Sequence, residues 1–350
     1  MSLPKHENLS VNRLAACFNN TSATYKFYWF LSILQAVESG LTIISKRELF
    51  AGMVSNAWYT VNYFHVSFGK QDKLQRAIEA LIDFEGMEVD ANLKVVKERL
   101  MQTDNKATVA ELNYFNSQVP HWFLAPWFPK ADRVEIYSGS NDYLNDCLYS
   151  LSNDSLTINP NWIHYLTTNA RVLKDFCYWN LTLYLQTKNP NVPDIAGKLI
   201  RPALRNSLRD QRVNFWNVVI NEIGSIDCIY TGKRLTVGDY AVEHFVPFAF
   251  VAHDLIWNLI PADIAFNCSK SDKLPRLDTY FEPFYRLQAT AIEIVQHVNP
   301  KNKYLEDYLT ILPELTMFTN NNNRAKQRYR EQLQPLLTIA ANNGFEYLSL

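Results

Sequence analysis

Residues 187–194, Thr-Lys-Asn-Pro-Asn-Val-Pro-Asp, constrain the fold more than any other segment of this chain. Prolines and asparagines at this density are typical of a turn or linker and cannot continue a helix or a central strand. The chain has 350 residues, enough for two or three domains. We therefore expect a boundary near residue 190, which separates residues 1–190 from the rest.

Apolar residues on both sides of this linker recur with helical spacing. Residues 24–84 and 93–112 are expected to be helical, and one long helix is expected from Pro160 to about Leu185. Beyond the linker, Pro202 suits the first turn of a helix that ends at Gly224. Residues 277–350 again have helical composition. With only ten glycines and no glycine-rich phosphate loop, the chain is expected to be mainly α.

Strand signals are few and short. Val134–Tyr137 alternates between apolar and polar residues and is expected to be a strand. Two more strands are expected at residues 226–230 and 240–245, with turn signals between them. Pro261–Lys270 is expected to be a short helix, and residues 119–129, which are rich in proline and aromatic residues, are expected to be a loop.

Charge and cysteine content exclude several classes of protein. The formal net charge is −1, so any contact with nucleic acid must come from local basic patches. The five cysteines form no C-x-x-C pair, so neither a disulfide framework nor a cysteine zinc knuckle is indicated. The most apolar segment, Phe27–Val37, is too short to span a membrane, and the first residues lack the apolar region of a signal peptide. We expect a cytoplasmic protein without a membrane partner.

A group of polar residues lies in the segment from residue 242 to residue 270. Glu243 and His244 are adjacent, and Asn258, Asn267 and Lys270 follow. Carboxylate and carboxamide oxygens suit a hard divalent cation, a histidine suits a general base, and a lysine suits a phosphate. One cation and one base are sufficient to hydrolyse a phosphodiester.

These residues and their neighbours resemble the HNH nuclease family. The likeness includes Cys228-Ile229-Tyr230-Thr231-Gly232, Val246-Pro247 and residues 267–275, and it covers about residues 195–276. It implies a ββα-metal HNH core at residues 191–280. A helical recognition or regulatory domain at residues 1–190 would precede this core, and a C-terminal helical extension at residues 281–350 would pack on it. The implied activity is metal-dependent cleavage of DNA, with restriction or anti-phage defence as the setting by analogy.

The resemblance also implies a role for each residue. His244 would take a proton from water, and Glu243 and Asn267 would hold Mg²⁺ or Mn²⁺. Lys270 would steady a phosphate oxygen, and Asn258 would hold the loop and the histidine in place. On a regular strand Glu243 and His244 would point to opposite faces, so the strand is expected to end or bend near Val246-Pro247.

The chain departs from the family pattern at three places. Asn267 stands where many family members have a histidine, and an oxygen ligand there favours Mg²⁺ or Mn²⁺ over softer metals. Glu243 stands where the first ligand is usually aspartate, which makes that side chain one methylene longer. Family members with a structural zinc carry two C-x-x-C pairs, whereas here the corresponding positions hold Cys228, Thr231, Asp263 and Phe266. One thiol cannot hold zinc, so no structural zinc is expected.

Basic residues precede the nuclease-like segment at steps of three and four. Lys198, Arg201, Arg205, Arg209 and Arg212 are expected to lie mostly along one helix face. We interpret Arg201, Arg205, Arg209, Arg212 and Lys273 as contacts for nucleic acid, with a solvated helix face as the alternative. The second basic cluster, residues 324–330, is better explained as a solvated helix, and His253-Asp254 as a turn or cap.

Three alternative functions remain open at this stage. The same residues would serve a nuclease that cleaves RNA. They would also serve an effector nuclease gated by a protein partner, which residues 1–190 would bind. A nucleic-acid-binding module without catalysis would bind with steep salt dependence and cleave nothing.

Overall fold

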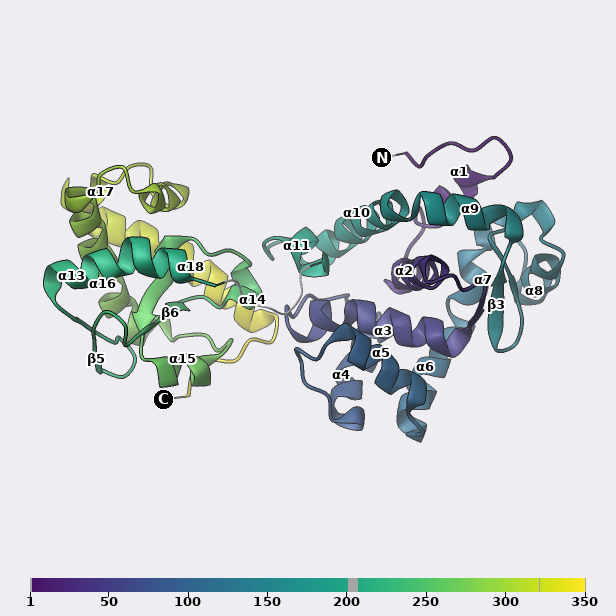
Figure 1. The fold of residues 1–350 in the computed structure, drawn as a ribbon, viewed down its shortest axis with the longest axis horizontal. Coiled ribbons are helices and arrows are strands. Elements are labelled where there is room, and N and C mark those ends of the chain that lie inside the picture. Colours follow the sequence, from purple (N-terminus) through teal and green to yellow (C-terminus); the bar gives the residue numbers. More distant parts are fainter. Residues whose placement is uncertain (1, 201–206, 321, 350) are drawn as a thin grey trace. The chain divides into compact units, whose positions relative to one another are not determined.

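The computed structural model describes residues 2–200, 207–320 and 322–349 (Figure 1). The chain forms two compact units, Met1–Pro190 with Ile195–Ala203 and Asn191–Asp194 with Leu204–Leu350. Helices dominate both units, which confirms a mainly α fold. None of the helices in the described residues has both the length and the apolar character that crossing a membrane requires.

The first unit combines helices with one small sheet. Strands β1 (Ile43–Ser45), β2 (Tyr149–Leu151) and β3 (Ser155–Ile158) form an antiparallel sheet in the order β1-β3-β2. Short 3-10 turns occupy Phe115–Ser117, Ala125–Trp127 and Leu144–Asp146. The helices are α1 (Val11–Ala16), α2 (Tyr25–Glu38), α3 (Lys46–Asn62), α4 (Lys73–Glu85), α5 (Leu93–Gln102), α6 (Lys106–Tyr114), α7 (Pro120–Phe123), α8 (Arg133–Asn141), α9 (Pro160–Thr168), α10 (Ala170–Lys188) and α11 (Ile195–Ile200).

Helix α2 forms the centre of this unit. Its residues are aromatic or aliphatic on almost every side and are buried, because α3 and α10 pack against it. The approach of α2 to α3 depends on Gly52, where an added Cβ would lie 2.7 Å from the Ser32 hydroxyl oxygen. The expected helices at residues 24–84 and 93–112 are confirmed, although the sheet was not expected.

Three expectations for this unit were wrong. Val134–Tyr137 is part of helix α8, because Asp132 and Glu135 form a capping box that starts a helix there. The expected helix from Pro160 is divided in two at Asn169, which takes a non-helical conformation. The aromatic segment at residues 119–129 contains α7 and a 3-10 turn and is not a simple loop.

Residues 209–223 of the second unit form a helix that contains a wider turn, and the expected helix start at Pro202 lies outside the described residues. Residues Arg212–Trp216 form the π-helical turn η4 between α12 (Arg209–Gln211) and α13 (Asn217–Ile223), and the helix ends at Gly224 as expected. The remaining elements are β4 (Ile226–Asp227), β5 (Arg234–Leu235), β6 (Ala241–His244), α14 (Phe248–Val251), the 3-10 turn Ile256–Asn258, β7 (Leu259–Ala262), α15 (Ile264–Lys270), α16 (Leu277–Val298), the 3-10 helix Lys303–Thr310, α17 (Met317–Asn320) and α18 (Asn322–Asn342).

The two expected strands of the second unit belong to different sheets of the described residues. Strand β4 pairs with β5, and β6 pairs with β7. Pro261 lies opposite Val242 in β7 and is not in a helix. Strands β6 and β7 followed by α15 form the ββα arrangement. Helices α16 and α18 pack on it: Phe284 lies 4.1 Å from Phe245 between ring centroids, and the Tyr329 hydroxyl donates to the Trp257 carbonyl.

Candidate nuclease site

Glu243 on β6 forms a buried ion pair with Lys270. Helix α15 contacts β6, and Lys270 at its end places Nζ 2.8 Å from Oε1 of Glu243 and 3.0 Å from the His244 carbonyl oxygen. The two side chains are 2% and 0% exposed. Lys270 therefore neutralises the Glu243 carboxylate, whereas the sequence suggested that it would face a phosphate.

His244 ends β6 and contacts a different carboxylate. Its Nε2 lies 2.9 Å from Oδ1 of Asp254, and its ring lies 5.6 Å from that of Phe248. The structure therefore brings His244 together with Asp254, while Glu243 contacts Lys270. The contact between Asp254 and His244 was not expected from the sequence, and Nδ1 of the neighbouring His253 accepts from the Leu255 amide at 3.4 Å, as in a turn.

Asn258 closes the loop between His244 and β7. Its Oδ1 accepts from the Val246 amide and its Nδ2 donates to the Val246 carbonyl, both at 2.8 Å. The Asn258 carbonyl also accepts from the Phe245 amide at 2.7 Å. These contacts fasten the residues that follow His244 to the start of β7, which is the loop-holding position inferred from the resemblance.

Two buried oxygens, Oδ1 of Asn267 on α15 and the hydroxyl of Tyr230 in the β4–β5 turn, have no hydrogen-bond partner among the described residues. Asn267 precedes Lys270 by three residues on α15, so the two side chains lie on neighbouring positions of one face. Burial, and then the charge of Glu243, raise the pKa of Tyr230, which places this hydroxyl within the field of the carboxylate.

The donor atoms at this place fit a hard divalent cation. A carboxylate oxygen and a carboxamide oxygen are ligands that Mg²⁺ and Mn²⁺ accept, and the Asn267 oxygen is buried without another partner in the described residues. Across those residues no three His, Cys, Asp or Glu side chains gather as metal ligands would. A cation held by Glu243 and Asn267 would therefore share the carboxylate with the Lys270 ammonium.

Only some of the expected nucleic-acid contacts lie together. Arg209 and Arg212 are exposed and line a cavity of about 290 Å³ together with Ala241 and Val242, directly before Glu243. Lys273 is half-buried after α15. Arg201 and Arg205 fall outside the described residues.

Lys198 departs from the expected basic face. It belongs to α11 of the first unit and is fully buried, and the Thr60 hydroxyl donates to its backbone carbonyl. The steps of three and four residues therefore did not predict one continuous basic face.

Three of the four positions considered for zinc, Cys228, Asp263 and Phe266, make other contacts. The Asp263 amide donates to Sγ of Cys228 at 3.4 Å, and Lys233 forms an ion pair with Asp263 at 3.1 Å. The rings of Tyr230 and Phe266 stack with 4.5 Å between centroids. A sulfur contact, an ion pair and a ring stack thus connect the β4–β5 turn to the start of α15.

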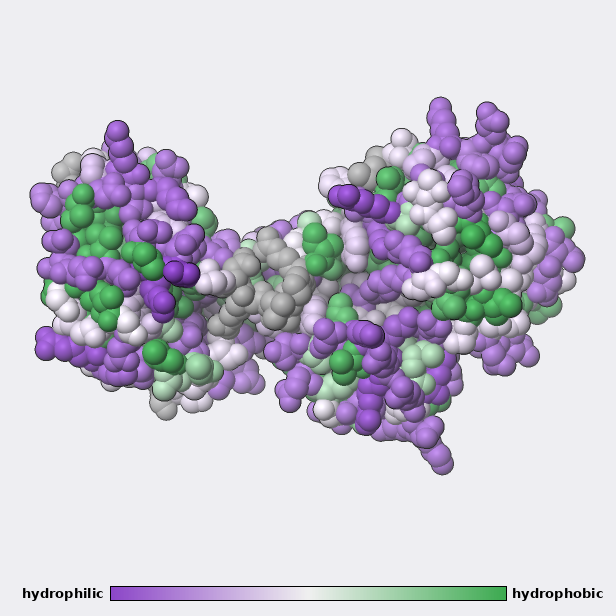
Figure 2. Space-filling model, viewed as in Figure 1, coloured by the Kyte–Doolittle hydropathy of each residue, from purple (hydrophilic) through white to green (hydrophobic). Residues whose placement is uncertain are grey.

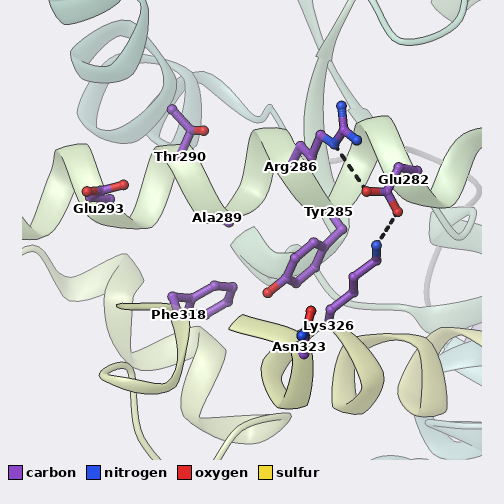
Figure 3. Close-up of a pocket in the computed structure, with 9 residues that line it drawn as sticks. All are labelled: Glu282, Tyr285, Arg286, Ala289, Thr290, Glu293, Phe318, Asn323 and Lys326. Atoms are coloured by element: carbon purple, nitrogen blue, oxygen red, sulfur yellow. Dashed lines mark hydrogen bonds and ion pairs between the residues drawn. The ribbon is translucent and has the colours of Figure 1, made fainter. Parts of the chain in front are cut away.

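A second polar cavity lies between α16 and α18 (Figure 3). Its volume is about 440 Å³, and Glu282 in its wall pairs with Arg286 at 3.1 Å and also with Lys326. One carboxylate thus offsets two cations, and no predicted site residue lines this cavity.

Figure 2 shows hydrophilic residues spread over the visible face of both units. The solvated-helix interpretation of residues 324–330 agrees with the exposed pair of Arg330 and Asp278.

Comparison with known proteins gives one match. Residues 228–276 match the family model described as HNH endonuclease. This range contains Cys228, both strands of the β6–β7 pair, the Asn258 loop and α15. No curated protein and no solved structure matches the chain.

Proposed function

On the premise that residues 228–276 match the HNH endonuclease family model, we propose that this chain is a divalent-metal-dependent endonuclease for double-stranded DNA. The observation that carries the proposal is the position of His244. It lies at the end of β6, with its ring on a carboxylate and its loop closed by Asn258. A ring oriented in this way is the arrangement that a general base requires.

Each of the site residues has its own role in the proposed hydrolysis. His244 takes a proton from water, which attacks phosphorus in line, and Asn258 keeps the loop after His244 in place. Glu243 and Asn267 would hold Mg²⁺ or Mn²⁺, which when bound supplies charge stabilisation at the phosphate and the departing oxygen. Lys270, now paired with Glu243, would turn to a phosphate oxygen when the carboxylate takes another partner.

Basic residues beside the site support a nucleic-acid substrate. Arg209 and Arg212 line the cavity next to Val242, one residue before Glu243 on β6. Guanidinium groups bind phosphate oxygens through paired hydrogen bonds, so these two arginines would track the backbone of the substrate near the cleaved bond. Lys273 is proposed as a further contact from its place after α15, and Arg201 and Arg205, which lie outside the described residues, are proposed from the sequence alone.

A cleavage assay tests the proposal. Supercoiled plasmid, linear duplex DNA and RNA of matched sequence are incubated with Mg²⁺, Mn²⁺ or Zn²⁺ and with the wild type or the His244→Ala variant. We expect cleavage of duplex DNA with Mg²⁺ or Mn²⁺, and a loss of about 10²- to 10⁴-fold in the variant with binding retained. Equal cleavage by wild type and variant would contradict the role of His244, and preference for RNA would change the substrate.

A partner-gated nuclease is the second candidate, favoured by the burial of the site. Glu243 and His244 are 1% and 3% exposed, so a phosphate reaches them only after neighbouring side chains move. A protein that binds the first unit is the proposed trigger. In this case the protein alone would cleave weakly, and adding lysate from its native host would raise the rate in the wild type and not in His244→Ala.

The cellular setting is part of the same proposal. By analogy we assign the chain to the cytoplasm and to restriction or defence against phage. Phage plaque counts on cells that express the wild type or the His244→Ala variant test this assignment: defence requires fewer plaques with the wild type only.

A further inference from the structure

The His244 ring is held from two sides. Nε2 lies 2.9 Å from Oδ1 of Asp254, and the Phe248 ring lies 5.6 Å away between centroids, tilted by 59°. The His244 side chain is 4% exposed and that of Asp254 is 20% exposed. A hydrogen bond at this distance in a partly dry environment fixes the orientation of the imidazole.

Asp254 is itself fixed by the loop that carries it. Gln211 donates from Nε2 to the Asp254 backbone carbonyl at 3.4 Å, and Oδ2 of Asp307 accepts from the Ile256 amide at 2.8 Å. Beyond Ile256, Asn258 fastens the end of the same loop to Val246. The position of the carboxylate therefore follows from contacts on both sides of Asp254.

The contact decides which ring nitrogen carries the proton. An ionised carboxylate accepts hydrogen bonds and cannot donate them, so Nε2 must be the donor. A neutral imidazole has one N–H, and the lone pair then lies on Nδ1. We propose that Asp254 is the positioning residue of His244, selecting the Nε2–H form and leaving Nδ1 as the base.

This inference rests on the proposed nuclease function. It adds Asp254 as the residue that orients His244 and Nδ1 as the ring nitrogen that takes the proton. In the hydrolysis of the phosphodiester, Nδ1 of His244 takes one proton from water while the water oxygen bonds to phosphorus. The bond from phosphorus to the 3′ oxygen breaks, and its electron pair stays on that oxygen, which takes a proton from solvent. The Asp254 carboxylate accepts from Nε2–H throughout and stabilises the imidazolium that forms.

Two variants of the full-length protein test the role of Asp254. Asp254→Ala removes the acceptor, and Asp254→Asn can present its NH₂ to the ring and so favour the other tautomer. Asp227→Asn, an exposed aspartate on β4, is the matched control. The first readout is the ¹⁵N spectrum of labelled histidine at about pH 8.5, where a free imidazole is neutral. The His244 signal is identified among the seven histidines by its absence in His244→Gln.

We expect the directly bonded proton of His244 on Nε2 in the wild type and in Asp227→Asn, and a different tautomer ratio in both Asp254 variants. In the cleavage assay we expect kcat to fall by at least about tenfold, up to the 10²- to 10⁴-fold that a general base contributes. KM for DNA should stay within about twofold, because substrate binding is not changed.

Two results would overturn the inference: an Nδ1–H form in the wild type, or an unchanged tautomer and kcat in Asp254→Ala. A merely structural role would reduce the folded fraction without changing the tautomer of the molecules that fold. If the wild type cleaves no substrate, the proposed function fails, and the tautomer measurement still decides whether Asp254 orients His244.

Discussion

Oε1 of Glu243 lies 2.8 Å from the Lys270 ammonium nitrogen, and both side chains are almost wholly buried. The same ammonium donates to the His244 carbonyl oxygen at 3.0 Å, so one lysine connects α15 to two consecutive residues of β6. A charge pair removed from water in this way is costly to break on one side only, because the remaining charge stays buried without a partner.

Lys270→Met should therefore destabilise the second unit by about 3–5 kcal/mol in the free energy of unfolding. The double variant with Glu243→Gln should recover most of that loss, since neither charge remains. Lys94→Met, which removes an exposed pair with Glu98 at 3.8 Å, should change stability by less than about 1 kcal/mol. Urea unfolding measures all three, and equal losses for Lys270→Met and Lys94→Met would contradict the ion-pair argument.

Removal of divalent metal should abolish cleavage and leave the fold intact. The β4–β5 turn is connected to α15 by the Cys228 sulfur contact, the Lys233–Asp263 pair and the stack of Tyr230 on Phe266. A chelator should then shift the Tm by less than about 2 °C, whereas a fold that depends on zinc is lost when the metal is removed. Calorimetry with and without chelator measures the shift, and a large fall in Tm would indicate a structural metal.

Arg209 and Arg212 should govern the salt dependence of DNA binding. If each contacts one phosphate, the slope of log K against log salt should become shallower by about 0.9 per arginine replaced by alanine. Binding is measured by fluorescence anisotropy in the His244→Ala background, which prevents cleavage. Lys94→Ala on the first unit is the control and should keep the original slope. Equal slopes for all variants would show that these arginines do not contact the phosphates of DNA.

His121 should make the first unit less stable in acid. Its ring is 2% exposed, and burial, then the charges of Arg133 and Lys46, lower its pKa from 6.5 to about 4. Between those two values the unfolded chain binds a proton that the folded chain does not, so stability falls as pH decreases. The slope from this group reaches about 1.4 kcal/mol per pH unit. In His121→Phe the unfolding free energy should vary less between pH 6.5 and 4, and identical pH slopes would contradict the prediction.

Sequence patterns predicted the helices and helix ends whose formation depends on residues close together along the chain. Helices α2 and α3 follow from their apolar content, and the end of α13 follows from Gly224, which takes a positive φ of 80°. The capping box of Asp132 and Glu135 is also a local signal, and it was available where a strand was expected instead.

Contacts between distant residues were not predictable in the same way. Pro261 suggested the start of a helix, yet it is tolerated in β7 because, among the described residues, that strand pairs on one side only, with β6. No periodicity relates Asp254 to His244, because an irregular loop brings them together. The ion pair of Lys270 with Glu243 likewise depends on how α15 packs on β6, which the spacing of these residues along the chain does not encode.

The π-helical turn at Arg212–Trp216 sets the direction in which Arg209, three residues before it, leaves the helix. A turn of this kind contains one residue more than an α-helical turn, and each residue rotates an α-helix by about 100°. Tyr240, next to β6, donates to the carbonyl of Arg212, the first residue of the wider turn, at 3.3 Å, and to Oδ1 of Asn217, just after the turn, at 2.7 Å. Deleting a single residue there would restore a regular helix and swing Arg209 around the axis, away from Val242. The extra residue thus fixes the rotation of Arg209 about the helix axis. A redesign that keeps the length of this helix but replaces the π-helical turn by a regular one would change that rotation.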